Sequence, residues 1–171
     1  MISTVARTSL FLALAACSAD VVIPAEQLAI FQVPPVAPAA DTPSSPDKIA
    51  LGESLYHEAR LSRAGKVSCA TCHSLETFGV DGKKTSTGTG GQVGGRNAPT
   101  SLNAFRQLAQ FWDGRAATVE DQATGPILNP IEHGLKDAAE VVGILKKDPA
   151  TLASFQKAFP GEADPVTLEN V

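Results

Sequence analysis

Apolar positions along most of the chain recur at helical spacing rather than alternating as they do in a β-strand. In the stretch DKIALGESLYHEARLS, Ile49, Leu55, Tyr56 and Ala59 fall at roughly the period of an α-helix. No segment has a convincing strand pattern, and the sequence contains no internal repeat. The pattern therefore predicts an all-α fold.

Start and stop signals predict further helices in the C-terminal half. Thr118 is a suitable N-cap for the segment TVEDQA, and Asp137 with Glu140 forms a D-x-x-E capping pair before AAEVVGILKK. Asp148 and Pro149 begin another helix, which ends at the next Pro-Gly pair. The last residues, DPVTLENV, resemble the opening of a helix without a closing signal, so we expect the sequence to be a fragment.

Long loops interrupt the helical pattern between these elements. The segment DGKKTSTGTGGQVGGRN has too little apolar content for a core and predicts irregular backbone. The segment TSLNAFRQLAQFW, capped by Thr100, predicts either a helix or a turn.

The N-terminus has the features of an export signal. Residues 1–16 combine a cationic start with a short apolar run, and the run is too short to span a bilayer. The stretch Leu14–Cys17 resembles a bacterial lipobox, which predicts lipidation at Cys17 and a location on the periplasmic side of a bacterial membrane. The alternative is an ordinary cleaved signal with an incidental cysteine. Residues 17–46 are rich in Pro and Ala and predict a tether, part of which can instead pack on the domain of residues 47–171.

Charge narrows the range of partners. The formal net charge is −4, from 14 basic and 18 acidic residues. A nucleic-acid-binding domain calls for a basic stripe, so we expect no nucleic-acid partner. We expect membrane contact only through the lipid anchor.

The motif C-A-T-C-H at Cys69, Cys72 and His73 is the attachment signature of heme c. The two thiols, about a turn apart, reach the heme vinyl groups, and the adjacent imidazole is then the proximal iron ligand. A thioredoxin-like redox pair does not need the histidine, and a zinc site needs a second ligand pair. The sequence therefore predicts one covalent heme c. Met1, the only methionine, is lost with the signal, so the common His/Met ligation is absent from this chain.

Two longer stretches carry a resemblance to a known family. LGESLYHEARLSRAGKVSCATCHS and GGRNAPTSLNAFRQLAQFWDGRAATVEDQATGPILNPIEHGL closely resemble the N-terminal heme domain of bacterial diheme cytochrome c peroxidases and their MauG relatives. The match runs from about residue 49 to 135 and continues weakly to the end. It implies a helical, cytochrome c-like domain that reacts with peroxide, followed in the complete protein by a second heme domain.

The resemblance also implies roles for single residues. Gln122 and Glu132 match the distal glutamine and glutamate, and Phe111 matches a wall of the distal pocket. A carboxylate in a mainly apolar pocket can carry a proton between the two peroxide oxygens, so Glu132 is the candidate acid–base group. Trp112 matches the tryptophan between the two hemes, which can also be a core residue.

Other matches concern ions and charges. Asn97 matches an asparagine that helps hold an interdomain calcium ion, although one asparagine is a weak signal for an ion that takes six to eight oxygens. Arg115 can pair with Asp113 or with a heme propionate, and the sequence does not separate these alternatives.

The chain departs from the family in its glycine-rich loop. Many members carry a histidine there that ligates the resting iron, and the corresponding residue here is Thr89. The sixth position is therefore expected to be empty, to hold water, or to be filled by His133 or another side chain. His133 can equally line the pocket or cap a turn, and we expect His57 to lie at the surface.

The resemblance implies a peroxidase that reduces hydrogen peroxide to water with electrons from a small cytochrome c or cupredoxin. The alternatives are a MauG-like enzyme that oxidises protein side chains and an electron-transfer module without turnover. A homodimer is a further expectation from the family.

Overall fold

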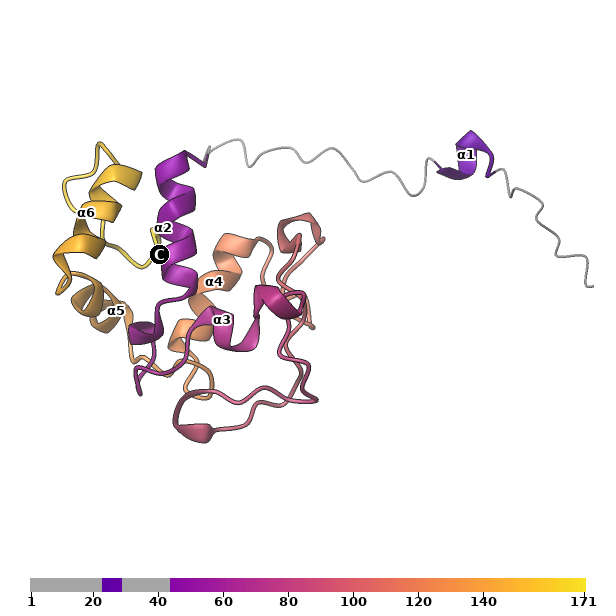
Figure 1. Ribbon diagram of the computed structural model, residues 1–171, viewed down its shortest axis with the longest axis horizontal. Coiled ribbons are helices and arrows are strands. Elements are labelled where there is room, and N and C mark those ends of the chain that lie inside the picture. The colour runs from indigo at the N-terminus through magenta and orange to yellow at the C-terminus, as the bar shows by residue number, and fades with distance from the viewer. Residues whose placement is uncertain (1–22, 29–43) are drawn as a thin grey trace, which may run out of the picture. The chain divides into compact units, whose positions relative to one another are not determined.

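The computed structural model describes residues 23–28 and 44–171 (Figure 1). The predicted signal at 1–16, the lipidation site Cys17 and most of the tether lie outside the described residues. Chain contacts divide the protein into a unit of residues 1–36 and a unit of residues 37–171. In the described part of the first unit, residues 23–28, the chain forms the short helix α1 (Ala25–Leu28), whose residues are exposed.

The second unit is built from helices and loops. The α-helices are α2 (Pro46–Tyr56), α3 (Cys69–Cys72), α4 (Val119–Leu128), α5 (Ala138–Leu145) and α6 (Pro149–Ala158). Short 3₁₀ turns, η2 (Ala59–Leu61), η3 (Leu75–Thr77), η4 (Thr89–Gly91) and η5 (Ala104–Arg106), lie between them. Across 44–171 there is no sheet, only two isolated bridges, so the all-α prediction is confirmed. None of the described helices is long and apolar enough to cross a membrane.

The predicted caps form hydrogen bonds in the structure. Thr118 Oγ1 accepts from the Asp121 backbone N–H at 3.1 Å and begins α4. Asp137 Oδ1 accepts from the Glu140 N–H at 3.0 Å and begins α5. Asp148 caps α6 in the same way, with Pro149 at its first position. These bonds satisfy backbone donors that have no partner inside the helix.

Two segments for which the sequence allowed a helix form mainly turns instead. In 100–112 only η5 forms, because Asn103 takes a left-handed conformation with φ 56° and interrupts the run. The C-terminal residues form turns rather than a helix, although Thr167 Oγ1 accepts from the Asn170 N–H as a cap would. In that segment Val166 is buried against the core.

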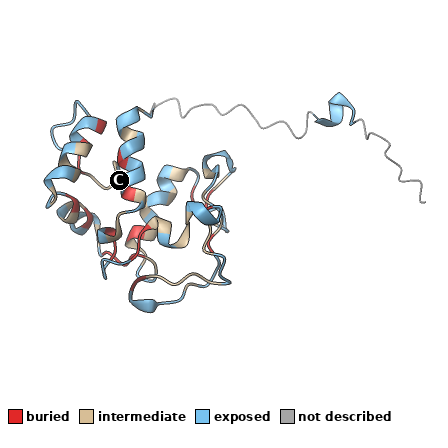
Figure 2. Cartoon of the chain, in the orientation of Figure 1, coloured by how far each residue is buried: buried red, intermediate tan, exposed pale blue. Residues whose placement is uncertain are grey.

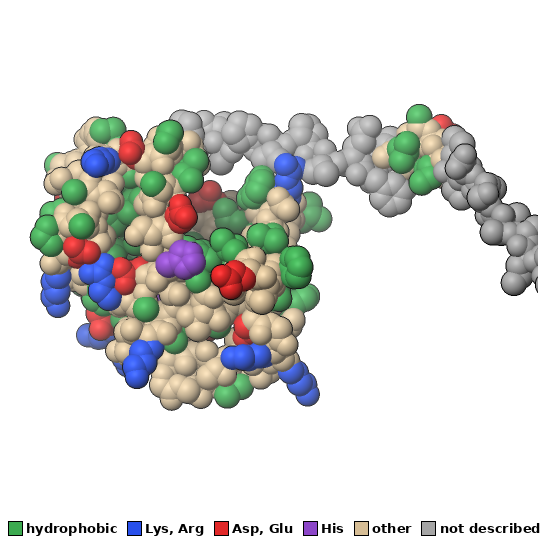
Figure 3. Space-filling view, in the orientation of Figure 1, with side chains coloured by type: hydrophobic (Ala, Val, Ile, Leu, Met, Phe, Trp, Pro, Cys, Tyr) green, Lys and Arg blue, Asp and Glu red, His purple; other side chains and the backbone are tan. Residues whose placement is uncertain are grey.

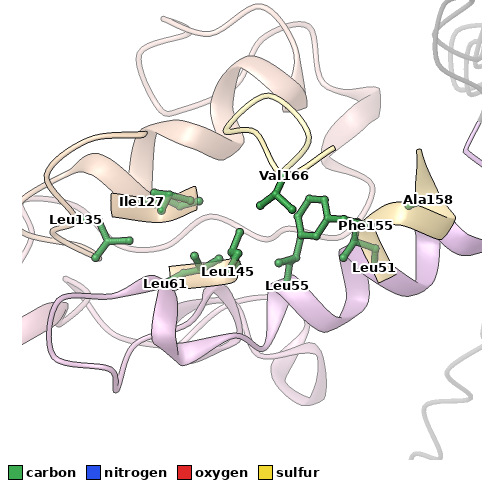
Figure 4. Close-up of a cluster of buried hydrophobic side chains, with 10 residues drawn as sticks. Leu51, Leu55, Leu61, Ile127, Leu135, Leu145, Phe155, Ala158 and Val166 are labelled. Carbon is green, nitrogen blue, oxygen red and sulfur yellow. The ribbon is translucent and has the colours of Figure 1, made fainter. Parts of the chain in front are cut away.

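The hydrophobic core lies among the helices and the loops that end on them. Figure 4 shows its side chains converging from α2, η2, α4 and α6. Phe155, Leu145 and Val141 are completely buried. Figure 2 shows buried residues on the inward helix faces and mostly exposed or half-buried residues along the loops. The core thus fixes the helices, and the residues of the predicted site lie on α3, on α4, in the loops between them and in the turn after α4.

Candidate heme and peroxide site

The two cysteines of the motif lie on the single turn of α3. The Ser68 backbone N–H donates to Thr71 Oγ1 at 3.0 Å, which closes the start of this turn. Cys69 and Cys72 are therefore three residues apart on one helical turn, and both are free thiols. Burial raises the pKa of each thiol, so the unreacted chain holds both as neutral groups.

His73 follows at the end of α3 with one ring nitrogen already engaged. Its Nδ1 lies 2.9 Å from the carbonyl oxygen of Pro99 and 3.1 Å from that of Gly79. Both partners are acceptors, so Nδ1 carries the proton and Nε2 keeps its lone pair. Metal-binding histidines are usually oriented by such a bond from the other nitrogen. Two thiols and an oriented imidazole therefore fit a covalently attached heme.

A tyrosine that the sequence did not single out holds the same turn. The Tyr56 hydroxyl donates to the carbonyl oxygen of His73 at 2.5 Å and lies 2.9 Å from Ser101 Oγ. Burial raises the pKa of Tyr56, so the hydroxyl remains a donor. Gly79 contributes to the same packing, because a Cβ there would lie 2.8 Å from the Ser101 backbone nitrogen.

A cavity of about 530 Å³ brings several of the predicted distal residues together. It is lined by Phe111, Arg115, Ala116, Ala117, Asp121, Gly125, Asn129 and Glu132. Figure 3 shows hydrophobic side chains at the surface on the side of the domain that carries α4 and the loops. The cavity lining combines the Phe111 ring and small residues with four polar or charged side chains, so it offers both contact surface and proton-handling groups.

Glu132 lies in the turn after α4 and is half-buried. Its Oε1 accepts from Asn129 Nδ2 at 2.7 Å, so one carboxylate oxygen is held and the other is available. Its charge contributes to the raised pKa of the Cys72 thiol, after the larger effects of burial and of Asp81. The Glu132 carboxylate therefore lies close enough to Cys72 to influence its thiol electrostatically.

Phe111 forms one wall of the cavity. A Cβ on Gly125 of α4 would lie 3.2 Å from the ring of Phe111, so a glycine allows the ring to pack against the helix. Arg115 stacks on the same ring, with its guanidinium carbon 3.4 Å from the ring centre. The Arg115 guanidinium also donates to Asp113 at 2.8 Å and lowers the pKa of that carboxyl. The ion-pair alternative for Arg115 is therefore present in the structure.

Trp112 and Gln122 do not line this cavity. Trp112 is 59% exposed, and its Nε1 donates to the carbonyl oxygen of Asn97 at 3.0 Å. Gln122 is half-buried on α4, one residue after the cavity-lining Asp121. The roles given to both residues stay predictions.

Asn97 and Trp112 share a second hollow of about 480 Å³ with Lys84, Gly95 and Arg96. No group of three His, Cys, Asp or Glu residues that could hold a metal ion occurs within 23–28 and 44–171. Calcium at Asn97 also stays a prediction.

Thr89, which occupies the position of the family's loop histidine, is buried, and its polar groups form hydrogen bonds. Its Oγ1 accepts from the Ala64 N–H at 3.2 Å, and its own N–H donates to the carbonyl oxygen of Glu132 at 2.7 Å. The preceding Gly88 lies so close that a Cβ there would be 2.0 Å from the carbonyl oxygen of Ile131. The loop is thus joined to the turn that carries Glu132.

His133 is buried beside that turn, and its Nδ1 donates to the carbonyl oxygen of Leu61 at 2.7 Å. Burial lowers its pKa, so the ring is neutral. It is not among the residues that line the cavity. His57 is exposed, and its ring contacts the edge of Tyr56.

Comparison with known proteins identifies relatives of the domain. The family model of di-haem cytochrome c peroxidase matches residues 46–171. Cytochrome c peroxidase Ccp of Escherichia coli K12 is 52% identical over 118 residues, which are 69% of this chain and 25% of the relative. Cytochrome c551 peroxidase of Pseudomonas aeruginosa is 43% identical over 75% of this chain and 37% of its own length. Methylamine utilization protein MauG of Methylorubrum extorquens is 40% identical over 75% of this chain and 36% of its own.

Solved structures show the same fold. The crystal structure of a MauG-like protein associated with microbial copper homeostasis aligns with a TM-score of 0.68 at 31% identity, over 77% of this chain and 40% of that one. The diheme peroxidase BthA from Burkholderia thailandensis aligns with a TM-score of 0.63 at 26% identity, over 75% of this chain and 37% of that one. The chain therefore spans about a quarter to two fifths of the length of these relatives.

Proposed function

Because the chain belongs to the di-haem cytochrome c peroxidase family, we propose that it carries one covalent heme c and forms the peroxide-reacting domain of a peroxidase. The observation that carries this proposal is the juxtaposition at α3. Two free thiols stand one turn apart, and the imidazole of His73 is held through Nδ1 with Nε2 free. Cys69 and Cys72 would form the thioethers, and His73 would be the proximal ligand. When bound, the heme supplies an iron that binds peroxide and exchanges electrons.

Glu132 is the proton-handling residue in this proposal. One of its carboxylate oxygens accepts a hydrogen bond from Asn129, so the other is free. The free oxygen would take a proton from the peroxide oxygen nearer the iron and return it to the peroxide oxygen farther from the iron. Phe111 limits the water around this carboxylate by closing one wall of the cavity. Gln122 would orient the peroxide, and Trp112 would conduct electrons toward the site.

The resting site is proposed to be open. Thr89 offers no imidazole, and its hydroxyl and N–H are both engaged in hydrogen bonds. His133 is buried, donates through Nδ1 to the carbonyl oxygen of Leu61 and does not line the cavity. Because Thr89 has no ligating nitrogen and His133 lies outside the cavity, the sixth position is left to water or to peroxide. An enzyme of this kind needs no prior reduction to remove a ligand.

A MauG-like activity is the second candidate function. The absence of a loop histidine at Thr89 favours it over a typical member, and MauG proteins are 36% to 40% identical to this chain. In that case the same site would oxidise a protein side chain instead of drawing electrons from a carrier. An electron-transfer module without turnover is the least supported candidate, because the chain has no methionine but Met1.

The remaining proposals concern the whole protein. The greater length of the relatives supports a second heme domain, and the cytochrome c peroxidases among them support a small cytochrome c, or a cupredoxin in its place, as the electron donor. A lipid anchor at Cys17, a periplasmic location, a calcium ion at Asn97 and a homodimer are proposed on the sequence and the family alone.

The proposal is tested by mixing the heme-loaded ferric protein with hydrogen peroxide and following the Soret band by stopped flow. Glu132→Gln should slow the change by orders of magnitude, because it removes the proton acceptor and keeps the shape. Glu53→Gln, on the exposed surface of α2, is the matched control and should react like wild type. Equal rates for Glu132→Gln and wild type would refute the role of Glu132. Absence of covalent heme in wild type would refute the proposal as a whole.

A further inference from the structure

Two side-chain oxygens in the described part of the chain are buried without a hydrogen-bond partner. They are Asp81 Oδ2 and Ser86 Oγ, which belong to the glycine-rich loop after α3. The other carboxylate oxygen of Asp81, Oδ1, accepts from the Lys83 N–H at 3.0 Å. Asp81 is thus fixed by one oxygen and unpartnered at the other.

Asp81 lies close to the residue that would ligate the iron. His73 Nδ1 is 3.1 Å from the carbonyl oxygen of Gly79, which is two residues before Asp81. The loop is held by its backbone, since the Gly94 N–H donates to the carbonyl oxygen of Ser86 at 2.9 Å. The Asp81 carboxylate also adds to the raised pKa of the Cys72 thiol, after the larger effect of burial. A carboxylate therefore stands near the residues that would hold the heme.

Such an arrangement is costly for the fold. A buried carboxylate oxygen without a donor loses its hydration and gains nothing in return. None of the ion pairs found across 44–171 includes Asp81. Unsatisfied buried groups are rare in native proteins and call for an explanation such as a redox role. Asp81 thus keeps a buried oxygen without a donor in the loop that contacts His73.

We propose that Asp81 sets the reduction potential of the heme by placing a negative charge that forms no ion pair near the residues that hold it. Reduction adds an electron to the iron, and a nearby negative charge opposes that step most strongly where water does not screen it. Asp81 therefore favours the ferric state, which is the state that would meet peroxide. This inference rests on the proposed covalent heme and not on peroxide turnover.

The test is a mediated spectroelectrochemical titration of the heme-loaded full chain with dithionite as reductant. Asp81→Asn keeps an oxygen to accept from the Lys83 N–H and removes the charge, so its midpoint potential should lie above that of wild type. Asp81→Glu keeps the charge and should stay near wild type. Asp121→Asn is the matched control, because this carboxylate lines the cavity but is exposed to water, so its removal should shift the potential much less.

Asp81→Ser provides a second neutral variant, since a serine can also accept from the backbone two residues on. Ser86→Ala removes only a dipole and should produce a smaller shift than Asp81→Asn. Equal potentials in Asp81→Asn and Asp121→Asn would overturn the inference. It would also be overturned if both neutral variants failed to hold heme while Asp81→Glu held it, since the charge would then serve assembly. Wild type without covalent heme would instead refute the proposed function.

Discussion

Two regions of the domain differ in how completely they bury apolar side chains and pair polar groups. They are the helices α2, α5 and α6 and the loops of residues 74–118. The helices bury Phe155, Leu145 and Val141 completely, and caps satisfy their first turns. The loops leave Phe78, Leu108 and Trp112 exposed and keep the two unpartnered polar oxygens. Exposed apolar side chains and orphan polar atoms in one region indicate that the region is completed by something else. The helices thus form the well-packed part of the domain, and the loops leave surface that the proposed heme would cover.

The loop half is nevertheless well defined by close backbone contacts. Gly88 lies against the carbonyl oxygen of Ile131, and Gly79 lies against Ser101. Phe111 adopts a left-handed φ of 65°, which a bulky residue takes only when its surroundings hold it. Its ring contacts both Gly125 and Arg115. Irregular backbone here is therefore fixed by tertiary contacts rather than by repeating hydrogen bonds.

The largest predicted effect is the loss of covalent heme when both motif thiols are removed. Cys69→Ala with Cys72→Ala should abolish covalent heme, measured as heme that survives acid–acetone extraction. The helical scaffold should still form, because neither cysteine belongs to the core cluster. Far-ultraviolet circular dichroism checks this. Loss of helical signal together with heme would contradict the separation of the two halves.

A core truncation should affect stability more than a loop truncation. Phe155→Ala should lower the free energy of unfolding by about 3–5 kcal/mol, because the ring is fully buried. Phe105→Ala, in the exposed part of the loop, should change it by less than about 0.5 kcal/mol in the heme-free chain. Urea unfolding measures both. Similar losses would mean that the loop half is packed as tightly as the core.

Glycine substitutions should separate the two halves further. Gly88→Ala should cost about 1–3 kcal/mol and disturb the loop near Glu132, because the new Cβ would meet the backbone oxygen of Ile131. Gly143→Ala, inside α5 with open space around it, should stabilise by up to about 1 kcal/mol. Thermal melts of both variants provide the comparison. Opposite signs are expected, and a neutral Gly88→Ala would show that the loop is not tightly fixed.

The smallest predicted effect is on the pH dependence of thermal stability. Burial lowers the pKa of His133 below its ordinary value of 6.5, so the unfolded chain takes up a proton before the folded chain does. Stability from this residue is complete above 6.5 and is lost as pH falls below that value toward the folded pKa. His133→Gln can still donate to Leu61 and should flatten the melting temperature between pH 7 and 5. Parallel pH profiles for the variant and wild type would contradict the buried neutral imidazole.

The sequence predicted features that depend on neighbouring residues. The caps at Thr118, Asp137 and Asp148 and the attachment motif at α3 are read within a few positions, and the structure contains them. Contacts across long separations were not predicted. Tyr56 bonds a carbonyl 17 residues away, and Thr89 accepts from a backbone N–H 25 residues away. Irregular loops have no period from which such pairs can be read.

The apolar residues of 100–112 illustrate the same limit. Leu102, Phe105 and Leu108 suggest one face of a helix, but all three are exposed and the segment forms only η5. Apolar residues at helical spacing predict a helix only where that face of the helix can be buried in a core. A segment that packs elsewhere, or on a cofactor, follows its turn residues instead, here Asn103.

The most direct test of the account is the optical and electron paramagnetic resonance spectrum of the ferric, heme-loaded protein, recorded with and without hydrogen peroxide. We predict covalent heme with a high-spin ferric signal that peroxide changes without prior reduction, because Thr89 has no ligating nitrogen and His133 is buried outside the cavity. A low-spin bis-histidine spectrum that is inert to peroxide, even after one-electron reduction, would contradict the open site and leave an electron-transfer module as the better description.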